Sequence, residues 1–154
     1  MIKNFLEIEN VTFNAGDKSK VNNLSLSIEN EGDIICLLGP SGIGKTTILR
    51  TIAGLEKIQS GKISLNNKII SSKNIHVDPE KRNISLSFQD NCLFPHYNVI
   101  QNIEFGAARN QKNKKDLNID EVISFLNLDH VKDKFPHEIS SGEAQRASLA
   151  RSLL

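Results

Sequence analysis

A glycine-rich octapeptide between two apolar segments constrains the fold of this chain more than any other feature. Residues 39–46 are Gly-Pro-Ser-Gly-Ile-Gly-Lys-Thr, which fits the spacing G-x-x-x-x-G-K-[ST] at every fixed position. The apolar run 34–38 precedes this loop, and Ile48, Leu49 and Ile52 form a helical stripe after it. A buried strand, a tight loop and a helix are therefore predicted in that order.

The chemistry of this loop favours an anion. Its glycines let the backbone curl, so that successive N–H groups point inward. The unpaired N–H groups at the start of the following helix carry about half an elementary charge and add to the same field. Lys45 is placed to reach the β- and γ-phosphates of a nucleotide, and the Thr46 hydroxyl to occupy a Mg²⁺ coordination position. The predicted phosphate-binding set comprises Gly39, Pro40, Ser41, Gly42, Ile43, Gly44, Lys45, Thr46 and Thr47. A plain turn before a helix, with Lys45 exposed, is the alternative.

Composition excludes several other classes of protein. Lys and Arg total 19 against 18 Asp and Glu, and Trp is absent, which offers nucleic acid neither a basic surface nor a stacking platform. The apolar run 34–38 is far short of the roughly 20 residues that a membrane span needs, and no secretion signal precedes it. Cys36 and Cys92 are too few for a disulfide framework. We expect a cytoplasmic protein without nucleic-acid partners and without direct membrane insertion.

Hydrophobic periodicity predicts an α/β architecture. Alternating apolar residues indicate strands in an antiparallel layer, with Asn66-Asn67 as a hairpin turn. The run 33–38 is apolar on both faces, which is typical of a buried parallel strand. Strands are predicted at 5–13, 21–28, 33–38, 63–65, 68–70 and 84–88, and helices at 45–53, 119–126 and 142–154.

Two further motifs narrow the class. The run 139–146, Ile-Ser-Ser-Gly-Glu-Ala-Gln-Arg, resembles the signature of the ATP-binding-cassette (ABC) family, usually L-S-G-G-Q followed by Q-x-R. The run 88–96, Phe-Gln-Asp-Asn-Cys-Leu-Phe-Pro-His, resembles the Q-loop of that family in the form typical of importers. Taken alone, Ser140-x-x-Glu143 is also an ordinary capping box. In family order behind the phosphate loop, the motifs identify the chain as a member of this family over essentially its whole length.

The resemblance implies the fold in more detail. It implies an α/β fold of the P-loop NTPase, ABC type, with a parallel core sheet, an antiparallel β side layer and a helical subdomain, truncated before the Walker B strand. We expect one partial nucleotide-binding domain over 1–154. Its expected parts are the antiparallel layer (1–32 and 60–75), the phosphate-loop strand and helix (33–58), the Q-loop strand (84–95), the helical subdomain (96–140) and the signature helix (141–154).

The resemblance also implies a function. It implies an ATP-binding subunit that energises solute import, with Mg-ATP held at residues 39–47 and Gln89 joining Thr46 at the Mg²⁺. In a head-to-tail dimer of two cassettes, the trans ATP contacts would be Ser140, Ser141, Gly142 and Glu143. Residues 92–99 are the expected docking surface for transmembrane permease subunits, which places the chain on the inner face of the cell membrane. The wording of the Q-loop is most like importers of ferric iron or another inorganic ion, and also like those for thiamine, polyamines, sulfate or molybdate.

The sequence departs from the family at two of its motifs. Ala15 stands where an aromatic residue usually stacks on adenine, and Phe13 is expected to point to the same face of the strand. Ser141 and Glu143 replace the usual Gly and Gln of the signature. Glu143 brings a negative charge near the expected phosphate, which is unfavourable unless this side chain points away or bonds Ser140.

The family's hydrolytic carboxylates find no match in 1–154. By the resemblance, a Mg²⁺-binding Asp, a water-polarising Glu and a phosphate-sensing His follow the signature. We therefore expect Gln89 to have a supporting role and the chain not to hydrolyse ATP efficiently. A non-catalytic nucleotide-binding fragment, or a degenerate partner of a complete cassette, is the alternative. A kinase or GTPase would leave the motif at 140–146 unexplained, and the Asn-Lys-x-Asp motif of GTPases is missing.

Overall fold

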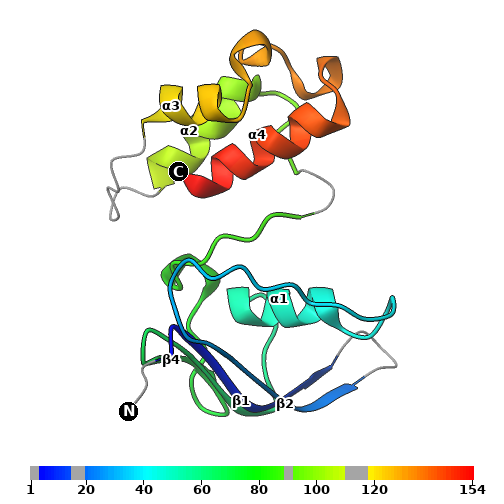
Figure 1. The fold of residues 1–154 in the computed structure, drawn as a ribbon, viewed down its shortest axis with the longest axis vertical. Helices are drawn as coiled ribbons and strands as arrows, with labels where there is room; N and C mark the ends of the chain where they lie inside the picture. Colours follow the sequence, from blue (N-terminus) through cyan, green and yellow to red (C-terminus); the bar gives the residue numbers. More distant parts are fainter. Residues whose placement is uncertain (1–3, 15–19, 89–91, 110–117) are drawn as a thin grey trace. The chain divides into compact units, whose positions relative to one another are not determined.

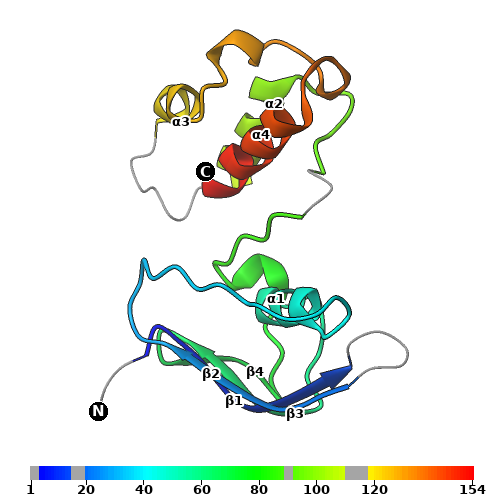
Figure 2. The same cartoon turned by 45° about the vertical axis from the view of Figure 1, so that its right-hand side comes forward.

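The computed structural model describes residues 4–14, 20–88, 92–109 and 118–154. The chain divides into two compact units, Met1–Ile84 and Ser85–Leu154. Figures 1 and 2 show the sheet-containing first unit and the helical second unit.

The first unit is built on an antiparallel sheet. Its strands are β1 (Leu6–Asn14), β2 (Lys20–Ile28), β3 (Ser60–Leu65) and β4 (Lys68–Ser72). They are arranged in the order β2-β1-β3-β4, and every adjacent pair is antiparallel. The predicted side layer is therefore confirmed, and its central strand β1 is the one that follows the N-terminus.

One face of this sheet holds the core of the first unit. The helix α1 (Lys45–Ala53) lies over that face in both views (Figures 1 and 2), with Ile48 and Ile52 packed against the core. Six buried side chains form this core: Leu6, Ile8, Val11, Phe13, Ile63 and Ile70. Burial of such apolar surface supplies the main driving force for holding the helix on the sheet.

Asparagines shape the strands of this sheet. Asn66 and Asn67, with φ of 48° and 63°, form the two-residue turn between β3 and β4. Positive φ at both positions is what a type I′ hairpin turn requires, so the predicted hairpin is confirmed. Asn10, with φ of 48°, lies at a register shift within β1. Beyond that irregularity Val11 and Phe13 are buried together with the Thr12 between them.

Two predicted core strands are absent among the described residues. The stretches 33–38 and 84–88 have no strand structure, and Ile34 and Leu38 are 95% and 88% exposed. An apolar sequence forms a strand only where a neighbouring strand accepts and donates its ladder bonds. Each ladder between the described strands is antiparallel, and none includes these stretches. The mixed α/β class and the antiparallel layer are confirmed, whereas the predicted parallel strands are wrong for these residues.

The second unit is helical. Its helices are α2 (Val99–Arg109), α3 (Ile119–Phe125) and α4 (Ser141–Leu153), joined by the short 3₁₀ turns η2 (Asp129–Val131) and η3 (Pro136–Glu138). Nine buried apolar side chains fill the space between them: Val99, Ile103, Val122, Ile123, Leu126, Leu128, Val131, Ala147 and Ala150. No helix among the described residues has the length and apolar character to cross a bilayer.

Local sequence signals explain where these helices begin. The Asn118 side chain accepts a hydrogen bond from the Asp120 backbone N–H and caps α3. The predicted helices at 119–126 and near 142 are confirmed, with ends shifted by a residue or so.

The small residue Gly106 lets α2 cross close to α4, since a Cβ there would collide with the Arg151 carbonyl.

Candidate functional site

The predicted phosphate loop leads directly into α1. Residues 41–44 form a turn followed by a bend, and Gly42 and Gly44 have φ of 82° and 106°, which L-residues with side chains rarely adopt. A Cβ at Gly42 would meet no other atom within 4 Å, so glycine is required there by the backbone angle and not by crowding. The loop has the curled backbone that its sequence predicts.

The N-terminus of α1 is open. Gly44 is the N-cap residue and contributes no side-chain hydrogen bond, and the first turn contains no acidic residue. The first turn of any α-helix has N–H groups that lack partners within the helix and carry a partial positive charge. With no carboxylate nearby on the helix itself, this end suits an incoming anion.

Lys45 folds back over the loop. Its Nζ donates to the Gly39 carbonyl at 2.8 Å and to the Pro40 carbonyl at 2.7 Å. An ammonium carries three donors, and these bonds use two of them. The bonds hold the cation above the loop backbone, so its charge adds to that of the helix end.

Thr46 and Thr47 complete the loop at the first turn of α1. Thr46 is exposed, which is compatible with a hydroxyl available to a cation. Thr47 is half-buried, and its carbonyl accepts a hydrogen bond from Thr51 Oγ1 at 2.7 Å. Gln89, the second predicted Mg²⁺ contact, lies outside the described residues, as does Ala15.

A buried arginine closes the opposite end of α1. Arg82 is 2% exposed, and its Nη1 donates to the carbonyls of Thr51 and Ile52 at 3.1 and 2.9 Å. Its Nε donates to the Val77 carbonyl at 2.7 Å, and its Nη2 donates to Ser71 Oγ at 2.8 Å. Burial lowers the pKa of Arg82. The guanidinium thus ties the C-terminal turn of α1, where a cation is favoured, to the sheet.

Gly54 makes room for this arginine. Gly54 follows α1 with φ of 89°, and its N–H donates to the Thr51 carbonyl at 3.1 Å. A Cβ at this position would collide with Arg82 Nε. No sequence pattern predicts this role of Arg82, because its acceptors come from segments up to 31 residues away.

Phe13 is a core residue. It is 1% exposed and belongs to the cluster beneath α1. Its ring is therefore committed to the core and does not replace the adenine-stacking aromatic residue that the family pattern has at position 15.

The signature segment forms the N-terminus of α4 in the second unit. Ser140 is the N-cap, and its Oγ accepts from the Glu143 N–H at 3.3 Å. In return Glu143 Oε2 accepts from the Ser140 N–H at 2.8 Å and from Ser140 Oγ at 2.7 Å. This reciprocal pattern is the capping box that the spacing predicts. Ser141 and Gly142 follow within the first turn of the helix.

Glu143 turns its carboxylate toward two partners of its own unit. Besides Ser140, the carboxylate contacts His130 through Oε1 and Nε2 at 2.9 Å. Hydrogen bonds from the Ser140 hydroxyl and backbone N–H, together with the contact to His130, lower the pKa of Glu143 to about 2. The sequence makes Glu143 compatible with a nearby phosphate only if its side chain points away or bonds Ser140, and the structure shows that it bonds Ser140. His130 was missed because it is 13 residues away and shows no motif.

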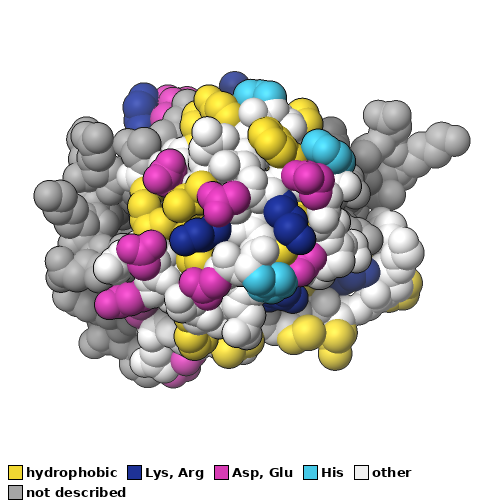
Figure 3. Space-filling view, turned by 90° about the horizontal axis from the view of Figure 1, so that it is seen from above, with side chains coloured by type: hydrophobic (Ala, Val, Ile, Leu, Met, Phe, Trp, Pro, Cys, Tyr) yellow, Lys and Arg dark blue, Asp and Glu magenta, His cyan; other side chains and the backbone are white. Residues whose placement is uncertain are grey.

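A turn near the start of the second unit carries the predicted docking surface. The Phe94 ring packs with the rings of His96, Tyr97 and Phe105, and the Phe94 and Phe105 ring centroids are 4.8 Å apart. Pro95 and His96 are exposed at the outside of this turn. The face of the molecule in Figure 3 carries acidic, basic and histidine side chains interspersed and no field of one sign.

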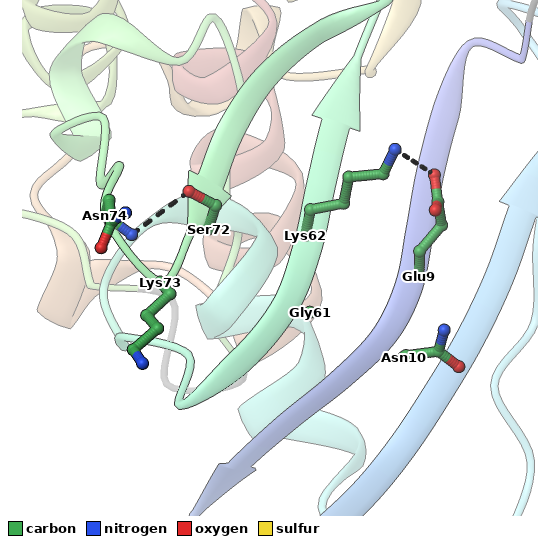
Figure 4. A pocket seen from close by; sticks show the side chains of 7 residues that line it. All are labelled: Glu9, Asn10, Gly61, Lys62, Ser72, Lys73 and Asn74. Atoms are coloured by element: carbon green, nitrogen blue, oxygen red, sulfur yellow. Dashed lines mark hydrogen bonds and ion pairs between the residues drawn. The ribbon is translucent and has the colours of Figure 1, made fainter.

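A separate groove lies on the sheet of the first unit (Figure 4). Lys62 Nζ contacts Glu9 Oε1 across it at 2.8 Å, which raises the pKa of Lys62, and the Asn74 N–H donates to Ser72 Oγ at 3.3 Å. Seven residues line the groove: Glu9, Asn10, Gly61, Lys62, Ser72, Lys73 and Asn74. It shares no residue with the phosphate loop.

The predicted site residues thus divide between the two units. The phosphate loop belongs to the first unit, and the signature segment and the docking turn belong to the second. Among the described residues, no group of three or more His, Cys, Asp and Glu gathers in a way that could hold a metal ion.

Curated proteins resemble the chain along nearly all of its length. It is 42% identical over 151 residues to the Fe(3+) ions import ATP-binding protein FbpC of Fusobacterium nucleatum, covering 97% of this chain and 39% of that protein. It is also 42% identical over 151 residues to the spermidine/putrescine import ATP-binding protein PotA of Chromobacterium violaceum, covering 97% and 40%. The sulfate/thiosulfate import ATP-binding protein CysA of Pectobacterium atrosepticum is 39% identical over 155 residues, covering 97% and 46%. The chain spans about two fifths of the length of these relatives.

Solved structures and the family profile agree with this picture. The structure of cbiO1 from Clostridium perfringens, described as part of the ABC transporter complex cbiONQ, has a TM-score of 0.76 at 28% identity and covers 98% of this chain and 61% of that one. The ATP-binding cassette MJ0796 bound to ADP and Pi shares the fold, with a TM-score of 0.74 at 24% identity over 96% of this chain and 68% of that one. The sequence profile described as ABC transporter matches residues 21–154. The chain therefore belongs to the ABC transporter family, with the mixed α/β fold of its ATP-binding cassettes.

Proposed function

We propose that this chain is an ATP-binding subunit that energises import of a solute, with Mg-ATP bound at residues 39–47. The observation that carries the proposal is the open N-terminus of α1, capped by Gly44 and free of acidic residues in its first turn. A curled loop, a helix end and the Lys45 ammonium present positive charge from three sources to one place.

The residues of the loop fit a nucleotide triphosphate with its cation. The backbone of 39–44 and the Lys45 ammonium would hold the phosphates, and the exposed Thr46 hydroxyl would contact Mg²⁺. The bound cation neutralises phosphate charge and orients the terminal phosphate. Gln89 is proposed as the second contact to the cation.

The signature segment is proposed to contact nucleotide held by a second cassette, in a homodimer arranged head to tail. Its support is the placement of Ser140, Ser141 and Gly142 at the start of the 13-residue helix α4. The Glu143 carboxylate is engaged by Ser140 and His130, which directs its charge into its own unit. An anion at this end would therefore meet Ser141 and Gly142 beside a capping box that Glu143 already occupies.

Binding, and not efficient turnover, is the proposed role of residues 1–154. Hydrolysis in this class needs a positioned water and charge stabilisation at the transferred phosphate. The described phosphate loop and the first turn of α1 contain no carboxylate, and that of Glu143 is bonded through both oxygens. A nucleotide-binding module that assists a complete cassette is the related alternative, and stimulation of the ATPase activity of such a cassette by this chain would favour it.

The relatives support a proposal for the partners and for the class of solute. Transmembrane permease subunits are proposed to dock at residues 92–99, at the inner face of the membrane. The names of the three relatives above specify Fe(3+) ions, spermidine/putrescine and sulfate/thiosulfate. We rank ferric iron or another inorganic ion first, in line with the Phe-Pro-His wording of the Q-loop.

Thermal unfolding of the purified chain with and without Mg-ATP tests the proposal. A ligand at 100 times its Kd stabilises the folded state by about 2.7 kcal/mol, so a cooperative transition should move upward in the parent. Lys45→Ala should abolish most of this shift, while the matched control Lys57→Ala, an exposed lysine beyond α1, should keep it. Equal shifts in parent and Lys45→Ala, or no shift in the parent, would reject nucleotide binding at this loop.

A further inference from the structure

A buried amide fixes the turn that carries the proposed docking surface. Asn102 on α2 is 0% exposed, and its Nδ2 lies 3.2, 3.1 and 3.0 Å from the carbonyl oxygens of Phe94, Tyr97 and Asn98, so its two hydrogens are shared among these three acceptors. Its Oδ1 accepts from the Phe94 N–H at 2.8 Å. A side chain that satisfies four backbone groups of one turn holds that turn in a single conformation, since an unpaired buried group costs about 1–3 kcal/mol.

Arg151 brings α4 to the same turn. Its Nη1 lies 3.4 Å from Asn102 Oδ1, and its guanidinium carbon lies 5.3 Å from the centroid of the Phe94 ring. The first contact is a long hydrogen bond, and the second has the geometry of a cation–π interaction. One side chain therefore touches both the amide that fixes the turn and an aromatic ring within it.

The two ends of α4 lie at different predicted sites. Its N-cap is Ser140 in the signature segment, and Arg151 lies in its last turn. At 1.5 Å per residue a helix of this length spans about 20 Å. Close crossing at Gly106 packs the C-terminal part of α4 against α2, the helix that carries Asn102. A shift of the Ser140 end therefore has a direct physical route, through one helix, to Arg151.

We propose that Arg151 is a positioning residue that couples the signature segment to the turn at 94–97. Engagement of Ser140 changes the position of α4, and Arg151 transmits the change to Asn102 and Phe94. The inference rests on the proposed function, because it takes residues 140–143 as the nucleotide-facing segment and 92–99 as the permease-facing one. A planar guanidinium suits this role, since it donates at its edge and stacks by its face.

The chain carries its own probe for this coupling. Tyr97 is the sole tyrosine, and the sequence has no tryptophan. Its ring lies 5.8 Å from that of Phe94 and 4.5 Å from that of His96. Intrinsic tyrosine fluorescence and its quenching by acrylamide therefore report on the turn alone.

A double-mutant cycle on the Tyr97 signal tests the coupling without nucleotide. Ser140→Ala should alter acrylamide quenching of Tyr97 in the parent background and lose that effect in the Arg151→Ala background. Ser152→Ala is the matched control, because it lies next to Arg151 and its hydroxyl donates within α4, to the Leu149 carbonyl. Additive effects of Ser140→Ala and Arg151→Ala on the quenching would overturn the proposal.

A conservative variant guards against misfolding. Arg151→Lys keeps the charge and the stem of the side chain, so we expect helix content by circular dichroism like that of the parent and a weakened effect of Ser140→Ala on Tyr97. If Arg151→Lys and Arg151→Ala both fold, and Ser140→Ala still has its full effect on Tyr97 quenching in each of them, the proposed role of the guanidinium is overturned.

Adding Mg-ATP distinguishes a failure of the proposed coupling from a failure of the proposed nucleotide binding. We expect nucleotide to change Tyr97 quenching in the parent, and this change to be lost in Arg151→Ala, which keeps thermal stabilisation by Mg-ATP. Retention of the Tyr97 response in Arg151→Ala would reject the coupling and leave nucleotide binding intact. Failure of Mg-ATP to stabilise the parent would reject the proposed function, while the nucleotide-free cycle would still decide whether α4 and the turn are coupled.

Discussion

The helices α1 and α4 both begin with a predicted anion-binding segment, yet their N-termini are built differently. α1 starts at Gly44, without a side-chain cap and without an acidic residue in its first turn. α4 starts at Ser140 and carries Glu143 in a reciprocal capping box. The first helix has no side-chain acceptor at its N-terminus, whereas the second supplies its own acceptor.

The difference shows how one physical feature serves two purposes. A helix N-terminus always has unpaired donors, and residues at the cap decide whether these are satisfied internally. At α1 no side chain satisfies them and phosphate is the proposed occupant, while at the far end Arg82 stabilises the helix by donating to two of its last carbonyls, which offsets the missing cap. At α4 the capping box already satisfies part of the helix N-terminus, so an anion would have to share that end with Glu143.

The anchoring of α1 by Arg82 gives the largest expected effect. Arg82→Met would leave the carbonyls of Thr51, Ile52 and Val77 without their buried donor. We expect the free energy of unfolding, measured in urea by circular dichroism, to fall by about 3 kcal/mol or more. Lys81→Met removes an exposed neighbouring charge and should cost at most about 0.5 kcal/mol. Equal effects of the two substitutions would remove the argument that the far end of α1 compensates its open N-terminus.

An acidic residue in α1 should convert its N-terminus to the type found in α4. Thr47→Glu places a carboxylate three residues after the cap, as Glu143 is in α4. We expect the affinity for Mg-ATP, measured by calorimetry, to fall about tenfold or more relative to Thr47→Gln, because like charges repel at short range. The glutamine variant controls for size. Equal affinities would show that the absence of acid in this turn is unimportant.

Loss of the α4 cap should produce a smaller effect on stability. Ser140→Ala removes the Oγ that accepts from the Glu143 N–H, which should lower the free energy of unfolding by about 1 kcal/mol. The same change should raise the pKa of Glu143, measured by carboxyl NMR, because the Ser140 hydroxyl is the largest cause of its depression. Ser152→Ala should change stability by less than about 0.5 kcal/mol. An unchanged Glu143 pKa would contradict the box.

The smallest expected effect is a pH dependence. The pKa of Glu143 is lowered to about 2 in the folded chain, so its contribution to stability is complete above the unfolded value of roughly 4.3. That contribution is lost as pH falls toward 2, because the unfolded state then binds the proton more tightly. Melting temperatures between pH 5 and pH 2 should therefore fall less in Glu143→Gln than in the parent. Glu121→Gln, at an exposed carboxylate in α3, should follow the parent, and parallel curves for all three would contradict the assignment.

Local features of both units could be predicted from the sequence, because their causes are local. The Asn66-Asn67 turn and the Ser140–Glu143 box are each formed by residues within three positions of one another. The phosphate loop is likewise encoded by its own glycines and Lys45.

Features that depend on distant partners could not be predicted. Arg82 has acceptors from 5 to 31 residues away, and His130 contacts Glu143 across 13 residues, so no spacing rule reveals either. The stretch 33–38 failed as a predicted strand for the same reason, since its apolar residues say what it would bury and not which strand would pair with it.

The crossing at Gly106 has a consequence for how this chain can vary. The α2 backbone approaches the Arg151 carbonyl so closely that any side chain at 106 would meet it. A single-nucleotide change that puts alanine or serine at position 106 would push α2 and α4 apart and would move Arg151 together with α4. Mutational drift at this position is thereby confined to glycine unless α4 repacks along with it, although position 106 lies in none of the three sequence motifs.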